Sequence, residues 1–161
     1  MKPLLPVIAC LMLFSCSNSS EEPADKDSDA PKFIPGIAAV DVYGNFEKQG
    51  FTVDKKLEGH QCTFTCDRVD GDKVYTVRAL GKNPSSIDKV EATVVFPKKE
   101  EVVKQFIGYA ASVPYTGSNP TAATQWATDH FNEGGDTTIG SVRFVLTARS
   151  STARVLALYP H

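Results

Sequence analysis

The chain has 161 residues, with 17 basic and 19 acidic side chains and a formal net charge of −2. A chain of this length can bury a core of its own without disulfide or metal staples. The near balance of charge excludes the strongly basic surface that nucleic-acid-binding proteins need, so we expect no nucleic-acid partner.

The amino-terminal segment is short and apolar. One positive charge, Lys2, is followed by an apolar run from Leu4 to Phe14 that only Pro6 interrupts. A helix needs about 20 apolar residues to cross a bilayer, and this run is much shorter. Its length and its basic start are typical of a secretory signal peptide.

The segment ends in Leu13-Phe14-Ser15-Cys16. This ending resembles the lipobox of bacterial lipoproteins, a resemblance confined to residues 1–16. It implies cleavage between Ser15 and Cys16, a diacylglycerol on the Cys16 thiol and a further fatty acid, such as palmitate, on the new amino terminus. It also implies an anchored protein of the bacterial cell envelope, which we expect on the outer membrane, facing either the periplasm or the outside.

A second cysteine is an alternative attachment site. Val7-Ile8-Ala9-Cys10 also matches the lipobox letters. Choosing Cys10 would shorten the signal to the residues before it and would leave apolar Leu11 to Phe14 at the start of the mature chain. We therefore favour Cys16. The remaining alternative is an uncut apolar segment with an incidental cysteine.

Residues 16–32 differ in composition from the remainder of the chain. Five carboxylates and no large apolar side chain lie between Ser17 and Lys32. Such a segment cannot bury enough surface to offset its ordering entropy, so we interpret it as a disordered acidic tether. An acidic stretch after a lipidated cysteine also resembles the surface-export signals of some double-membraned bacteria. The predicted organisation is a signal peptide at 1–15, a lipidated cysteine with its tether at 16–32, and one globular domain at 33–161.

Patterns of apolar spacing predict the elements of this domain in chain order. Helical spacing over 37–49 precedes a short strand at 51–53. Alternation of Cys62, Phe64 and Cys66 with polar residues predicts a strand with one dry face. Asp70-Gly71-Asp72 predicts a hairpin turn. Further strands are expected at 73–80 and 90–96.

The second half of the domain is predicted to hold two helices and two strands. The first helix covers about 98–111, and a loop follows at Val113–Asn119. Asn119 as the N-cap and Pro120 at the first helical position begin the second helix. Strands at 138–147 and 154–159 end the chain. The order predicts an α+β fold, with an antiparallel sheet of about five strands and helices packed on one face.

Few side chains suggest chemistry, and we expect neither a metal nor another cofactor. Cys62 and Cys66 lie about 13 Å apart on one extended strand. A disulfide needs Cα atoms within about 7 Å, so two buried thiols are expected. Asp70-Gly71-Asp72 lacks the further oxygen ligands of a calcium loop. The histidines of the chain are His60, His130 beside Asp129, and His161. No nucleophile motif accompanies them, and adjacent residues of a helix do not face each other, so we expect no catalytic or metal role for them.

Two surfaces remain as candidates for binding. Arg143, Arg149 and Arg154 are expected near one end of the last hairpin, where they could hold an anion. The loop Val113–Asn119 with an exposed Tyr115 could be a contact surface. The sequence therefore predicts a membrane-anchored, non-catalytic binding or assembly module whose partner is an envelope protein or a glycan. The alternatives are a small envelope hydrolase and an inhibitor of a foreign enzyme.

Overall fold

The computed structural model describes residues 33–58, 61–98 and 101–161, and these form one antiparallel sheet with three helices. The helices are α1 (Ala39–Glu47), α2 (Glu101–Ala111) and α3 (Pro120–Asp129). The strands are β1 (Thr52–Glu58), β2 (Gln61–Asp70), β3 (Lys73–Asn83), β4 (Ser86–Val95), β5 (Gly135–Ile139), β6 (Val142–Ser150) and β7 (Ala153–Pro160).

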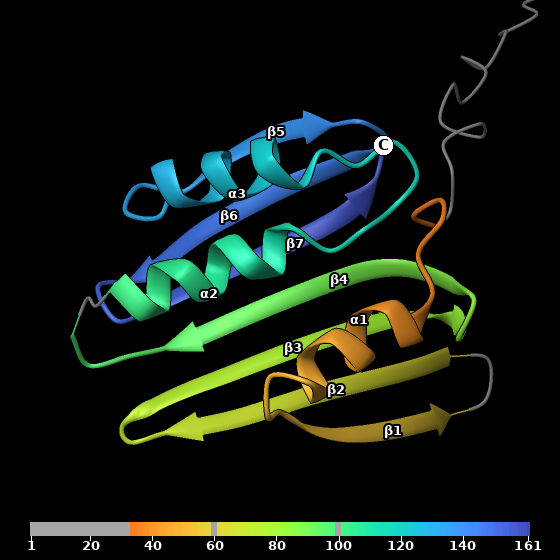
Figure 1. Ribbon diagram of the computed structural model, residues 1–161, viewed down its shortest axis with the longest axis horizontal. Coiled ribbons are helices and arrows are strands. Elements are labelled where there is room, and N and C mark those ends of the chain that lie inside the picture. Colours follow the sequence, from red (N-terminus) through yellow and green to blue (C-terminus); the bar gives the residue numbers. More distant parts are fainter. Residues whose placement is uncertain (1–32, 59–60, 99–100) are drawn as a thin grey trace, which may run out of the picture.

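The sheet has the strand order β1-β2-β3-β4-β7-β6-β5, and each neighbouring pair is antiparallel. The first four strands form a meander of hairpins. The last three form a second meander, which joins the first through β7 beside β4 (Figure 1). The two hairpin series thus build one continuous sheet with β1 and β5 at its two edges.

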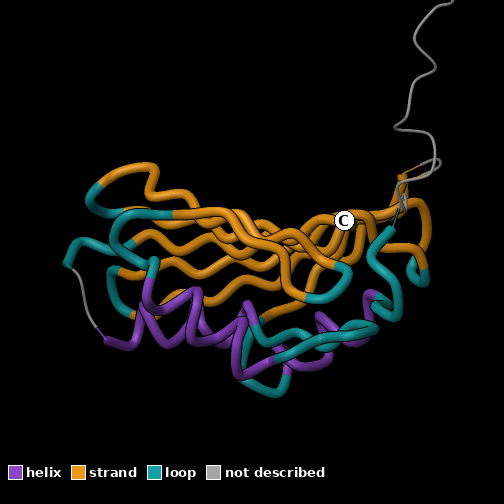
Figure 2. Tube along the Cα trace, turned by 90° about the horizontal axis from the view of Figure 1, so that it is seen from above, coloured by secondary structure: helices purple, strands orange, loops and turns teal. Residues whose placement is uncertain are grey.

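The three helices lie along one side of this sheet (Figure 2). α1 contacts β2 and β3, whereas α2 contacts β4 and β7 and packs against α3. Buried and more exposed residues alternate along the strands, because successive side chains point to opposite faces of the sheet. In β2, Cys62, Phe64 and Cys66 are buried beneath the helices while the residues between them are not. We call the opposite side of the sheet the helix-free face.

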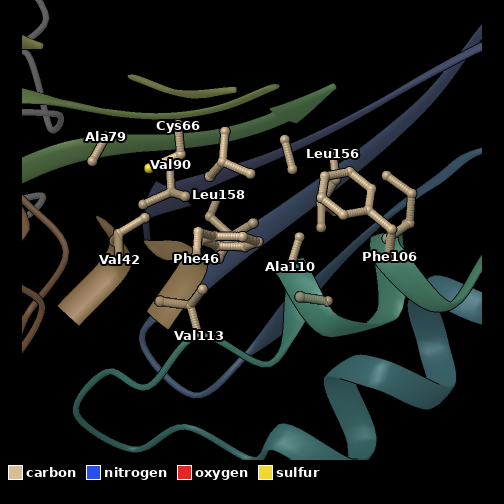
Figure 3. Close-up of a cluster of buried hydrophobic side chains, with 14 of the residues drawn as sticks. Val42, Phe46, Cys66, Ala79, Val90, Phe106, Ala110, Val113, Leu156 and Leu158 are labelled. Carbon is tan, nitrogen blue, oxygen red and sulfur yellow. The ribbon is translucent and has the colours of Figure 1, made fainter. Parts of the chain in front are cut away.

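The core fills the space between the helices and the sheet. Val42 and Phe46 of α1 and Phe106 of α2 project toward the sheet, where they meet side chains such as Leu156 and Leu158 of β7 (Figure 3). These side chains are almost inaccessible to water. Each fully buried side chain of this size contributes about 1.5–3 kcal/mol of hydrophobic free energy. The core therefore holds the helix layer onto the sheet.

The predicted α+β class with an antiparallel sheet is confirmed, but the prediction of about five strands is wrong, because the sheet has seven strands in the described part of the chain. The interpretation of 138–147 as one strand missed a tight turn at Gly140 that separates β5 from β6. Gly140 has φ 60°, and a Cβ there would lie 2.3 Å from the backbone oxygen of Gly117. Only glycine fits this crowded position, so the Gly-Ser pair at 140–141 was the signal for a two-residue hairpin.

The helices agree with the sequence patterns in place and type. α3 begins at Pro120, and the Asn119 side chain accepts a hydrogen bond from the Ala122 N–H at 3.1 Å. This N-cap satisfies one of the unpaired donors at the start of the helix. The predicted cap is thus confirmed, and the predicted hairpin turn at Asp70-Gly71-Asp72 is confirmed by the β2–β3 register, in which Asp70 pairs with Lys73.

Candidate binding surface

A row of exposed valines crosses three neighbouring strands on the helix-free face. Val69 of β2 pairs with Val74 of β3, which in turn pairs with Val95 of β4. They are 69%, 42% and 45% exposed, respectively. Paired residues of adjacent strands have Cβ atoms about 5 Å apart, so the three side chains form one apolar strip. We call these three residues the valine row.

The apolar character of this face continues beyond the row. Val95 pairs with Ala153 of β7, and the next outward residues of β7 are Val155 and Ala157. Both are nearly buried, although no helix in the described part of the chain covers this side of the sheet. An apolar strip thus extends from the valine row toward the middle of the helix-free face.

A polar hollow of about 320 Å³ occupies the other end of the same face, over β1, β2 and β3. Its lining residues are Lys56, Glu58, Gln61, Thr63, Thr65, Arg78 and Leu80. Cations, a carboxylate and hydroxyl groups are mixed there, so the hollow has no single charge preference. It could bind a neutral polar group through hydrogen bonds.

The valine row lies far from the point where the described chain begins. The Ile34 N–H donates to the Ile87 oxygen at 2.7 Å, which places residue 34 beside the start of β4. Val95 is at the end of β4, eight residues further on. At about 3.3 Å per residue the separation along the strand is roughly 26 Å. The first described residues and the valine row are therefore at opposite ends of the sheet (Figure 1).

The structure does not bring the three candidate arginines together. Arg143 and Arg149 are exposed near opposite ends of β6, roughly 20 Å apart along the strand. Arg143 pairs with the Asp136 carboxylate, an ion pair that raises the pKa of Arg143 and lowers the pKa of Asp136. Arg154 is on the face opposite to Arg143 and is only 2% exposed. The expected convergence of these residues is therefore not observed.

Arg154 is instead a buried structural residue. Its guanidinium donates to the Phe131 oxygen, to the Ser150 oxygen at 2.6 Å and to the Ala153 oxygen at 2.8 Å. The rings of Phe96 and Phe131 lie within 5.6 Å and 5.0 Å of Cζ. Desolvation lowers the pKa of Arg154. Because its donors are occupied by backbone carbonyls, this residue holds the segment after α3 against β7.

Cys62 and Cys66 are free and buried on the helix side of β2, as the strand geometry predicts. Burial raises the pKa of the Cys66 thiol to about 11, and the nearby carboxylates of Asp67 and Glu47 act in the same direction. Burial and the charge of Asp88 also raise the pKa of Cys62. The thiolate is the reactive form, so both residues are poor nucleophiles.

We expect neither Cys62 nor Cys66 to react with iodoacetamide in the native protein at pH 8, and we expect both to react fully in denaturant.

The raised pKa of the Cys66 thiol also predicts that the stability of the protein depends on pH. The folded state keeps the Cys66 thiol neutral. The contribution of this neutral thiol to the free energy of unfolding is therefore complete below about pH 9 and is lost as the pH rises toward about 11. Mass spectrometry of the labelled protein checks the first expectation, and Cys66→Ala as a reference in alkaline melts checks the second. Rapid native labelling of both thiols would contradict the burial.

His130 is a helix-terminal residue rather than part of a catalytic pair. Its Nδ1 lies 2.8 Å from the Trp126 oxygen, and its ring stacks on the Trp126 ring. Asp129 instead accepts hydrogen bonds from Gln125. No group of three or more potential metal-ligating side chains occurs within the described ranges. His60 lies outside the described residues, as do Ser15, Cys16 and Cys10.

The predicted exposed loop around Tyr115 is wrong in its main feature. Tyr115 is only 6% exposed, and its hydroxyl donates to the Ile139 oxygen at 2.6 Å. Ser141 Oγ donates to the Thr116 oxygen at 2.9 Å from the same β5–β6 turn. Apolar packing and these hydrogen bonds hold the loop against the hairpin. It is therefore not the protruding contact loop that an enzyme inhibitor would present.

The valine row was missed by sequence analysis, although a signal was present. Val69 and Val74 flank the predicted Asp70-Gly71-Asp72 turn at the ends of the two strands it joins. A two-residue hairpin places such positions opposite each other. Their exposure, however, depends on which face the helices cover, and this is a property of the whole fold.

Comparison with known proteins does not assign this chain to a family, because no protein-family model, no curated protein and no solved structure matches it. In the described part of the chain, no helix has the length and apolar character needed to span a bilayer.

Proposed function

We propose that this chain is a lipid-anchored protein of the bacterial envelope that binds a partner protein through the valine row, without catalysing a reaction. The lipobox-like ending at Cys16 supports the anchor, and the predicted acidic tether supports a domain that stands away from the lipid surface. The observation that carries the binding role is the exposure of Val69, Val74 and Val95 side by side on the helix-free face.

The position of the valine row favours a partner away from the anchoring membrane. The row lies at the end of the sheet opposite residue 33, where the tether would join the domain. An anchored domain would therefore present it outward. Contiguous exposed apolar side chains are typical of protein contact sites. A protein partner also fits these side chains better than a glycan, because aliphatic side chains offer a glycan neither hydrogen bonds nor an aromatic ring to stack on.

A photo-crosslinking amino acid in place of Val74, in the full-length protein in cells, tests this function. We expect a discrete protein adduct on irradiation. The matched control places the same amino acid at Val40 of α1, which is also exposed but lies on the helix side. We expect no such adduct from position 40, and we expect Val95→Glu to reduce the adduct from position 74 at least about fivefold, because the glutamate places a charge in the apolar contact.

Two outcomes would overturn the binding role. The first is the absence of any adduct from position 74. The second is the same adduct from positions 74 and 40, since that would indicate contact without a specific surface.

A further inference from the structure

A groove runs between α1 and α2 on the helix side of the sheet. Tyr109 of α2 separates it into two hollows of about 240 Å³ and 150 Å³. The larger hollow is lined by Gln49, Phe51, Arg68, Val102, Gln105, Phe106 and Tyr109. Val102 and Tyr109 are each 38% exposed at its rim. The lining is therefore mostly apolar and aromatic, with a single cation.

That cation, Arg68, is held by aromatic rings rather than by a carboxylate. Its Cζ lies 4.8 Å from the ring centres of both Phe51 and Tyr75. Nη1 donates to the Gln49 oxygen at 3.1 Å. The ion pairs found across the described ranges do not include Arg68. Among the described residues, the positive charge of Arg68 thus has no carboxylate partner.

Two buried polar atoms, one on Arg68 and one on its partner residue in β3, also lack acceptors within the described part of the chain. Among the described side chains, the buried polar atoms without a hydrogen bond are Arg68 Nε and the Tyr75 hydroxyl. Arg68 and Tyr75 are directly paired between β2 and β3, and Tyr75 has no exposed surface. Leaving a buried donor unpaired is costly, and the majority of such groups in folded proteins find a partner. Arg68 therefore keeps hydrogen-bonding capacity that the described part of the chain does not use.

We propose that this groove binds a small aromatic carboxylate, with the ring against Phe106 and Tyr109 and the carboxylate on Arg68. A planar guanidinium matches a carboxylate through two parallel hydrogen bonds. Arg68 lines the larger hollow, and its guanidinium has donors beyond the one given to the Gln49 oxygen that can face the carboxylate. This site is on the other side of the sheet from the valine row and is independent of the function proposed above.

The dimensions and the lining of the groove restrict the ligand. At about 240 Å³ the hollow is smaller than the roughly 300–1,000 Å³ of sites for drug-sized molecules. A ligand with a single ring and a short side chain fits such a space. The rings of Phe51, Phe106 and Tyr75 already pack edge-on or stacked against one another. Another aromatic ring can join this arrangement with favourable geometry.

Titration of the full-length protein with 3-phenylpropionate, followed by calorimetry and by NMR, tests this proposal. We expect saturable binding at one site. The alcohol of the same shape, 3-phenyl-1-propanol, is expected to bind at least about tenfold more weakly, because it cannot form the charge-assisted pair. Arg68→Met keeps the aliphatic stem and removes the donors, so it should weaken 3-phenylpropionate at least about tenfold without affecting the alcohol.

The matched control is Arg78→Met, which removes a cation from the neighbouring strand on the helix-free face. It should leave binding unchanged. Tyr109→Ala at the exposed rim provides a second variant should Arg68→Met fail to fold, and it should weaken both the acid and the alcohol. Equal binding of the acid and the alcohol would overturn the proposal. So would absence of saturation at about 10 mM, or a crystal structure in which only an ordered water bridges Arg68 Nε and the Tyr75 hydroxyl after soaking with the acid.

Discussion

Under the proposed lipid anchoring, Cys16→Ser is expected to remove the acyl mass from the protein and with it the protein's hold on the membrane. The predicted attachment atom is the Cys16 sulfur, and a serine hydroxyl does not replace it. Each buried methylene contributes about 0.8 kcal/mol, so two or three acyl chains hold a protein almost permanently whereas none leaves it unanchored. Intact-mass measurement of the purified protein and membrane fractionation of cells check this expectation.

Cys10→Ser is the matched control for Cys16→Ser. It changes the other cysteine that the lipobox letters allow. The intact mass of the protein and its membrane fractionation should therefore both equal those of the wild type. The assignment of Cys16 would be contradicted by a protein with an unmodified Cys16 thiol in the wild type. It would also be contradicted by loss of the acyl mass in Cys10→Ser rather than in Cys16→Ser.

The class of the fold was predictable because its signals are local. Alternation in β2 made Cys62, Phe64 and Cys66 one face of a strand, and these residues are buried together. The Asn119 cap and Pro120 marked the start of α3 from two adjacent residues. Such patterns depend on the geometry of one element. They hold whatever the element later packs against.

The two proposed binding surfaces were not predictable because they depend on contacts between distant segments. The helix-free face exists only once α1, α2 and α3 lie on one side, and only then are Val69, Val74 and Val95 exposed together. Arg68 likewise has no sequence pattern that sets it apart from other strand residues. Its position among Phe51, Tyr75 and Phe106 requires three elements to meet.

The expected arginine patch was wrong for a related reason, because the fold decides which face of the sheet each arginine occupies. Sequence position placed Arg143, Arg149 and Arg154 near each other because they flank one hairpin. A strand alternates its two faces, however, so the number of residues between two positions decides which face each occupies. Arg154 points to the helix side, where the carbonyls after α3 are within reach. The residue expected to bind a solute thus stabilises the fold.

Arg154→Met is expected to lower the free energy of unfolding by about 2–4 kcal/mol. Methionine keeps most of the apolar contact with Phe96 and Phe131 but donates no hydrogen bond. The oxygens of Phe131, Ser150 and Ala153 would each lose a charged donor. Removal of a buried charge returns part of its desolvation cost, yet the buried Phe131 oxygen and the partly buried oxygens of Ser150 and Ala153 all lose this donor, so the loss prevails. Denaturant melts of the two proteins measure the difference.

Arg143→Met is the control variant, because it removes one positive charge without removing the buried hydrogen bonds of Arg154. Arg143 is exposed, and its pair with Asp136 is in water, so the melting midpoint should stay within error of the wild type. Arg154→Lys should be intermediate, because a single ammonium cannot reach three carbonyls with the fixed fork of a guanidinium. Hydrogen exchange should localise the loss to residues 131–134 and the start of β7, since these are the segments that Arg154 joins. A methionine variant as stable as the wild type would mean that the desolvation of Arg154 cancels its three hydrogen bonds, and the segment after α3 would then be held by packing alone.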